Sequence, residues 1–85
     1  MINIASRLKD DLTVVELIEL LKSASNPSGY ILVPFEVLSN ASRGSHDTIN
    51  YCKEHGFIRV EKSGKKCYEF YITAKGLAFL KSRIS

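Results

Sequence analysis

Hydrophobic residues in the first third of the chain repeat with the period of a helix. The apolar stripe between residues 12 and 24 consists of Val14, Leu17, Ile18 and Leu21, with Val15 and Leu20 beside it. Spacings of three and four residues place such side chains on one helix face. Thr13 and Glu16 have the spacing of a capping box. We therefore predict a helix over 12–24 whose wide apolar face is covered on more than one side.

The segment after this helix predicts a short strand and a short helix. Turn-forming residues at 25–29 end the first helix, and the apolar run at 30–33 is rich in β-forming side chains. Pro34 suits the first position of a helix that stops near Asn40. The core-facing residues of this helix are Phe35, Val37 and Leu38.

A third helix follows after a tight turn at 41–44. Ser45 suits its N-cap, the helix runs over 46–55, and Gly56 suits the C′ position just past its end. Its core-facing residues are Ile49 and Cys52. Two helices joined by a tight turn that contains glycine indicate a helix-turn-helix.

Alternating apolar and polar residues predict two strands, over 57–62 and 67–72, joined as a hairpin by 63–66. Thr73 suits the N-cap of a last helix that ends near Ile84. The core-facing strand residues are Ile58 and Val60, then Tyr68, Phe70 and Ile72. The order of elements predicts an α+β fold.

Length and composition limit the classes of function. The chain has 85 residues, of which 45% are hydrophobic and 25% charged, which is typical of one globular domain. A domain this small does not enclose a deep active site, and no catalytic motif is present, so we expect no enzyme. No stretch approaches the ~20 apolar residues of a membrane span, and no leader segment is recognisable. We expect a cytoplasmic protein without a membrane partner.

Charge is unevenly distributed along the chain. The first 42 residues carry three basic and five acidic side chains, whereas the rest carry nine basic and four acidic ones. The net charge of +3 therefore combines −2 in the first part with +5 in the second. A basic half of this kind favours a polyanionic partner, and a solvated lysine-rich surface is the alternative.

Two motifs resemble those of winged helix-turn-helix proteins. Ile49 and Cys52 lie seven and four residues before Gly56, which Phe57 and Ile58 follow, as at the junction of their recognition helix and wing. The segment 71–76, Tyr-Ile-Thr-Ala-Lys-Gly, is similar to their second wing strand running into a T-x-K-G helix start. The resemblance covers residues 12–84 and extends to MarR-like, PadR-like and small archaeal or archaeal-virus regulators. Cys52 departs from the usual leucine but packs as a small hydrophobe.

The resemblance implies a single winged-helix domain with a three-helix core, a short strand, a wing and a C-terminal helix. It implies sequence-specific binding of double-stranded DNA and a role in transcription regulation. The recognition helix, 45–55, would enter the major groove, and the wing, 62–67, would lie on the backbone or in the minor groove. The domain spans 1–85 and divides into an N-terminal arm (1–11), the helix-turn-helix (34–55), the wing hairpin (57–72) and the C-terminal helix (73–85).

The expected DNA-binding residues lie at the third helix and the wing. Backbone N–H groups at the start of a helix bind phosphate, Asn50 can pair with adenine, and Arg43 can pair with guanine or phosphate. Lysines of the wing can replace counterions along the phosphate backbone. The full set is Arg43, Ser45, His46, Thr48, Asn50, Tyr51, Lys53, Lys62, Lys65 and Lys66.

Plainer roles stay open for several of these residues. Ser45 can serve only as a cap, Tyr51 can pack against the wing, and the lysines can form a solvated hairpin tip that protects an edge strand. Asp47 and Glu54 on the outward face of the third helix repel phosphates. They favour the alternative interpretation, a winged-helix protein–protein interaction module that does not bind DNA.

Cysteine and histidine spacing does not indicate a metal site. Cys52 and His55 stand three residues apart, but Cys67 follows alone without a paired knuckle. We expect no metal and no small-molecule cofactor. Strand alternation turns Cys67 away from the core face, which disfavours a Cys52–Cys67 disulfide, while an intermolecular bridge through Cys67 stays open.

The chain has more apolar surface than one small core needs. The first helix is apolar over more than one face, Phe79 points away from the stripe of the last helix, and Ile2, Ile4 and Leu8 stand in a polar arm. We expect a homodimer formed by the arm, the first helix and the last helix, with recognition helices ~34 Å apart. The alternative is that these side chains close the core of the monomer.

Overall fold

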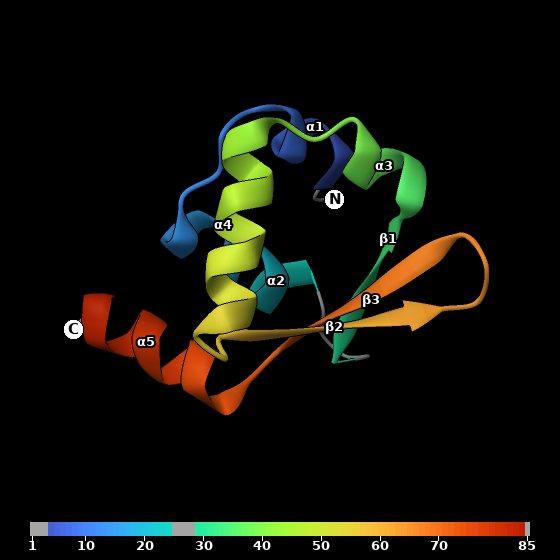
Figure 1. Ribbon diagram of the computed structural model, residues 1–85. Coiled ribbons are helices and arrows are strands. Elements are labelled where there is room, and N and C mark those ends of the chain that lie inside the picture. The colour runs from blue at the N-terminus through green and yellow to red at the C-terminus, as the bar shows by residue number, and fades with distance from the viewer. Residues whose placement is uncertain (1–3, 25–28, 85) are drawn as a thin grey trace.

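A computed structural model describes residues 4–24 and 29–84, which form five helices and a three-stranded antiparallel sheet (Figure 1). The α+β class is as predicted, and the sheet has the strand order β1-β3-β2. The elements are α1 (Ile4–Lys9), α2 (Val14–Ala24), β1 (Tyr30–Pro34), α3 (Phe35–Ser39), α4 (Arg43–Glu54), β2 (Ile58–Ser63), β3 (Cys67–Ile72) and α5 (Ala74–Ile84).

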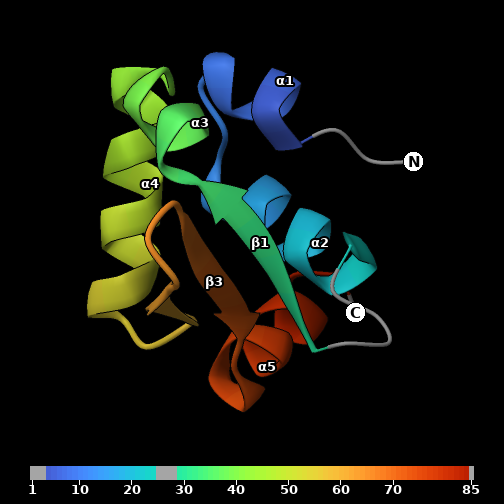
Figure 2. The ribbon, with the colours of Figure 1, turned by 90° about the vertical axis from the view of Figure 1, so that its right-hand side faces the viewer.

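Helix α2 lies at the centre of the fold and packs against α4, α5, β1 and β3 (Figure 2). Its side chains Leu17, Ile18 and Leu21 are fully buried, and Leu20 is nearly so. The prediction that its wide apolar face is covered on more than one side is confirmed. This burial supplies most of the stabilisation of the helix, because an isolated helix of this length is marginal in water.

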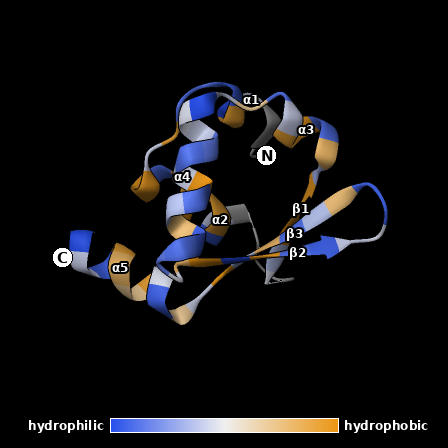
Figure 3. Cartoon of the chain, viewed as in Figure 1, coloured by the Kyte–Doolittle hydropathy of each residue, from blue (hydrophilic) through white to orange (hydrophobic). Residues whose placement is uncertain are grey.

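The sheet turns one face toward α2 and α4. Phe70 on the central strand is fully buried and pairs with Ile31 on one side and Val60 on the other. The strand residues predicted to face inward all belong to the core or pack against it: Ile58, Val60, Tyr68, Phe70 and Ile72. The loop of the β2–β3 hairpin is hydrophilic and projects away from this core (Figure 3).

The start of α2 has the predicted capping box. The Thr13 backbone N–H donates to Glu16 Oε1 at 3.0 Å, and the Glu16 N–H donates to Thr13 Oγ1 at 3.2 Å. Hydrogen bonding from the Thr13 backbone and side chain to the Glu16 carboxylate, together with the nearby Arg7, holds the pKa of this carboxyl below its usual value. Because Thr13 is the cap, the helix begins at Val14 and not at residue 12.

Two boundaries in the middle of the chain differ from the prediction. Pro34 ends β1 and is the N-cap of α3, so it is not the first helical residue. Its backbone is extended (ψ 147°), which continues the strand. The predicted end of α3 is confirmed, because Asn40 is its C-cap. The expected turn at 25–28 lies outside the described residues.

The N-terminal segment contains a short helix that the sequence analysis assigned to a polar arm. Leu8 of α1 is fully buried, and its carbonyl accepts a hydrogen bond from the Ser42 N–H at 2.9 Å. Phe79 of α5 is half-buried and stacks on Phe57 at a centroid distance of 4.6 Å. Leu8 therefore closes the monomer core and has no exposed surface for a dimer contact. Phe79 is only half-buried, and its place in a dimer contact stays a prediction. Ile2 and the side chain of Ile4 lie outside the described part.

The T-x-K-G motif fastens α5 to the end of α4. Thr73 Oγ1 accepts from the Gly76 N–H at 3.0 Å, which confirms the predicted cap, and it donates to the Gly56 carbonyl at 2.6 Å. Gly56 has φ +73°, as a C′ glycine does. A Cβ on Gly76 would stand 2.2 Å from the Phe57 carbonyl oxygen. Glycine is therefore required for the close approach of α5.

We predict that Gly76→Ala lowers the free energy of unfolding by about 2–3 kcal/mol, because the new methyl group overpacks against backbone. This loss is opposite in sign to the effect of helix propensity, which favours alanine by about 1 kcal/mol. Urea denaturation measures the free energy of unfolding of Gly76→Ala and of a control, Ala78→Gly, at an exposed position of the same helix. The control should lose about 1 kcal/mol. A more stable Gly76→Ala variant would contradict the close approach.

Candidate nucleic-acid interface

The first turns of α4 are held by the segment that joins α1 to α2. Ser42 is the N-cap, and its hydroxyl oxygen accepts from the Ser45 N–H at 3.1 Å. The helix therefore begins at Arg43, three residues earlier than predicted. Ser45 is fully buried, and its hydroxyl donates to the Asp10 carbonyl at 2.7 Å and accepts from the Leu12 N–H at 3.3 Å. The prediction of Ser45 as cap is wrong, and its side chain does not reach the surface.

Thr48 and Asp11 complete this contact. The Thr48 hydroxyl donates to the Leu12 carbonyl at 2.5 Å, so it is engaged inside the fold. The Asp11 carboxylate accepts from the Ser42 hydroxyl at 2.6 Å and lies so close to Gly44 that a Cβ there would be 2.4 Å from Asp11 Cγ. A carboxylate at this place interacts favourably with the positive end of the α4 dipole. Its negative charge also opposes a phosphate at this helix start, where the sequence predicted one.

The remaining predicted residues of α4 are exposed, but they do not share one side of the helix. His46, Asn50 and Lys53 line a groove toward the hairpin, and Arg43 is exposed in the first turn. Tyr51 is 44% exposed and stacks on the ring of His55 at a centroid distance of 3.9 Å. It lines a second groove, toward α2 and α5, so the structure separates it from the others.

The hairpin is fixed to α3 near its tip. The Phe35 N–H donates to the Lys66 carbonyl at 2.8 Å, and the Phe35 ring lies 4.5 Å from the Tyr68 ring, centroid to centroid. Lys62 places its Nζ 5.8 Å from the Phe35 ring centroid, within the range of a cation–π contact. Lys65 and Lys66 are exposed at the turn. The three predicted wing lysines therefore lie together along one end of the hairpin.

Between α4 and the hairpin runs a groove of about 450 Å³, which we call the α4–hairpin groove. Its floor is apolar, and polar groups come from α4. The lining residues are Phe35, Leu38, His46, Ile49, Asn50, Lys53, Val60, Tyr68 and Phe70. Within the described part of the chain, no carboxylate lines this groove.

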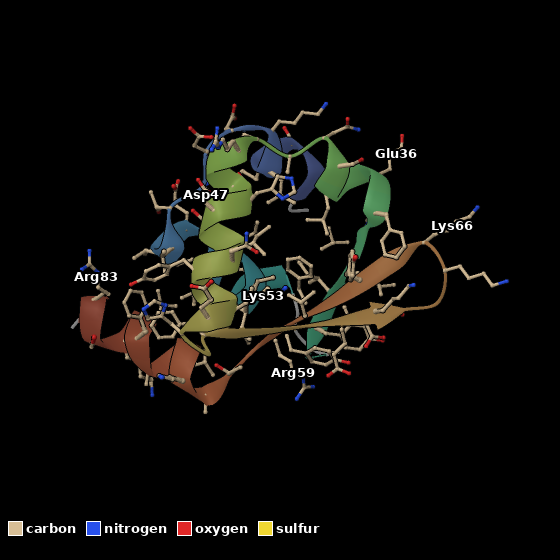
Figure 4. All side chains as sticks on the ribbon, viewed as in Figure 1. Glu36, Asp47, Lys53, Arg59, Lys66 and Arg83 are labelled. Atoms are coloured by element: carbon tan, nitrogen blue, oxygen red, sulfur yellow. The ribbon has the colours of Figure 1, made fainter. Side chains whose placement is uncertain are left out.

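Basic and acidic side chains of α4 lie on different sides of the helix. Figure 4 shows Lys53 on the side of the helix that faces the hairpin and Asp47 on the opposite side, while Lys66 extends from the hairpin end. Lys53 thus lies on the α4 wall of the groove, and Lys62 of the hairpin lies beside the opposite wall, against the Phe35 ring. Of the basic side chains predicted from sequence, His46 and Lys53 line the groove, and Lys62 lies against its Phe35 ring. Arg43, Lys65 and Lys66 are exposed but do not line the groove, and neither do Ser45, Thr48 and Tyr51.

Neither cysteine offers a reactive thiol to this groove. Cys52 is fully buried, and burial raises the pKa of its thiol to about 11, so the thiol stays protonated and unreactive near neutral pH. Cys67 lies on the other face of the sheet, and both thiols are free. Among the described residues, no group of three histidine, cysteine or acidic side chains could hold a metal ion.

Sequence reasoning missed the aromatic part of the site. The sequence predicts Phe35 and Tyr68 as core residues, because Phe35 begins an amphipathic helix and Tyr68 lies on the inward face of a strand. The structure leaves both half-buried, and the five-residue α3, to which Phe35 belongs, has no buried residue. The predicted helix after Pro34 is short, and this was the one feature of the sequence that could have indicated incomplete burial of these rings.

Comparisons with known proteins give no family: no protein-family model, curated protein or solved structure matches the chain. No helix within 4–24 and 29–84 has the length and apolar character needed to cross a membrane.

Proposed function

We propose that the chain is a winged helix-turn-helix protein that binds double-stranded DNA and regulates transcription by occupying a promoter as a homodimer. In this assignment α3 and α4 are the helix-turn-helix, and the β2–β3 hairpin is the wing. One observation carries the proposal: Lys53 on one wall and Lys62 on the other flank a groove that no described carboxylate lines. A concave surface with cations on both walls focuses a field that attracts a polyanion.

Each wall has a distinct task in this proposal. Lys62, Lys65 and Lys66 neutralise phosphates and set the register of the protein on the duplex. Arg43 and Asn50, exposed on α4, carry the groups that pair with guanine and adenine in the major groove. Thr48 and Ser45 act indirectly, because their hydroxyl groups hold α4 against the segment before α2.

We predict that wild-type protein binds a random duplex with an affinity that falls steeply as salt rises. The variant Lys62→Glu/Lys65→Glu/Lys66→Glu should lose both the affinity and most of the salt dependence, because each lysine releases about one counterion. Fluorescence anisotropy across a salt series measures both. The control Lys22→Glu/Lys75→Glu/Lys81→Glu has the same net charge change at exposed residues of α2 and α5, which are not part of the hairpin.

Two outcomes would contradict the proposal. If both variants lose affinity equally, binding reflects net charge and not the wing. If the wild type does not bind at low salt, the protein–protein interaction module becomes the better interpretation. The acidic side chains Asp47 and Glu54, exposed on α4, would then mark a surface for a basic protein partner.

The homodimer part of the proposal rests on a second surface. A groove of about 680 Å³ lies between the start of α2, the end of α4 and α5, and we call it the α2–α5 groove. Half-buried Val14, Val15 and Phe79 and exposed Tyr51 give it an apolar lining. Glu19 and Arg83 supply opposite charges on the same groove. In a two-fold dimer, each Glu19 can face the partner's Arg83, so the surface is complementary to itself.

We predict that wild type sediments as a dimer at micromolar concentration, whereas Glu19→Arg and Arg83→Glu are each monomeric, because like charges then face one another. Mixing the two variants should restore a dimer, because every facing pair again has opposite charges. Sedimentation velocity of each variant and of the mixture gives the result. A monomeric wild type would contradict the proposed homodimer. A mixture that stays monomeric would contradict the pairing of Glu19 with the partner's Arg83.

A further inference from the structure

The floor of the α4–hairpin groove is larger and more apolar than contact with phosphates requires. Lysine contacts to a duplex backbone use the rim, from Lys53 and Lys62, and leave the floor unused. Half-buried Leu38 and Val60 form that floor above the buried Ile49 and Phe70, and the groove volume of about 450 Å³ lies in the range of sites that hold small molecules. The groove therefore has room for a group that the rim contacts do not supply.

Two aromatic rings lie at the hairpin end of this floor. The rings of Phe35 and Tyr68 are 4.5 Å apart, centroid to centroid, and tilted by 46°. Both residues line the groove. Unpaired nucleobases stack on such rings without regard to sequence, whereas a base inside a duplex is already stacked on its neighbours. The aromatic pair thus matches an unpaired base better than a paired one.

Hydrogen-bonding groups face the same space from α4. Asn50 has a side-chain amide that both donates and accepts, as the edge of a nucleobase requires. His46 lies one turn before it and Lys53 one turn after it on the groove side. Lys62 lies against the Phe35 ring on the opposite wall. A base on the floor would therefore have cations on both sides for its flanking phosphates.

Acidic side chains make the outward face of α4 unfavourable for phosphates, so a nucleic acid would contact the groove side of the helix. Asp47 and Glu54 are exposed there, and Figure 4 shows Asp47 on the side opposite Lys53. Their charge resists a position of the helix flat against two phosphate backbones. A strand that passes between Lys53 and Lys62 avoids both carboxylates.

We propose that the α4–hairpin groove binds an unpaired nucleotide of a nucleic acid, at the end of a duplex or extruded from it. The base lies on the apolar floor against Phe35 and Tyr68, Asn50 bonds its edge, and Lys53 and Lys62 hold the flanking phosphates. This inference rests on the proposed DNA binding and adds to it a preference for duplexes with unpaired bases.

The test compares a short blunt duplex with the same duplex extended by a few unpaired adenines, one replaced by the fluorescent base 2-aminopurine. Wild type should bind the extended duplex about tenfold more tightly, as one stacked base provides, and the 2-aminopurine fluorescence should change on binding. Phe35→Leu should lose that preference and keep its affinity for the blunt duplex. Asn50→Ala, at an exposed position, should weaken binding of the extended duplex more than binding of the blunt duplex, without affecting folding.

Ser39→Ala is the matched control, because Ser39 is exposed on α3 and does not line the groove. Equal affinity for the two duplexes with unchanged 2-aminopurine fluorescence would overturn the inference while DNA binding stands. Binding of free adenosine monophosphate as tightly as the extended duplex would also overturn it, because the site would then serve a free nucleotide. Failure to bind either duplex at low salt would defeat the DNA-binding proposal and this inference with it.

Discussion

The buried hydroxyl of Ser45 is the contact on which the position of α4 depends. It joins the helix to the backbone of Asp10 and Leu12, and Thr48 makes a second bond to the Leu12 carbonyl one turn later. A buried hydroxyl without partners costs free energy, so these bonds specify one place for the helix. Because α2 begins directly after this segment, the same bonds set α4 relative to the central helix of the core.

The other wall of the α4–hairpin groove is fixed by separate contacts. The Phe35 N–H holds the carbonyl of Lys66, which ties the hairpin turn to α3. Thr73 and Gly76 hold the start of α5 against the carbonyl groups of Gly56 and Phe57, where α4 leads into β2. Both ends of the hairpin are therefore attached to helices. The hairpin that carries the lysines is therefore held in place by contacts within the protein.

Local signals in the sequence were sufficient for most of the fold. The capping box at Thr13, the C′ glycine at Gly56 and the cap at Thr73 depend on contacts within three or four residues, and all three are confirmed. The start of α4 was missed for a non-local reason. Ser42 and Ser45 are equally good caps by sequence, and the choice is made by a bond from Ser45 to Asp10, 35 residues away.

The candidate site was predicted only in part for the same reason. Spacing alone places lysines on a hairpin, and of these Lys62 lies beside the groove, against the Phe35 ring. The aromatic part depends on the contact of Phe35 in α3 with Tyr68 in β3, 33 residues later, which no local pattern predicts. The separation of Tyr51 from Lys53, two residues away, follows from the direction in which each points once α4 is docked.

The most direct test of the α4–hairpin groove as the nucleic-acid interface is an NMR titration of the protein with a duplex at low salt, followed by backbone amide chemical shifts. We predict shifts concentrated at 46–53 on α4 and at 60–68 on the hairpin, which diminish as salt is raised. Shifts confined to α2 and α5, or none at saturating duplex, would contradict the account.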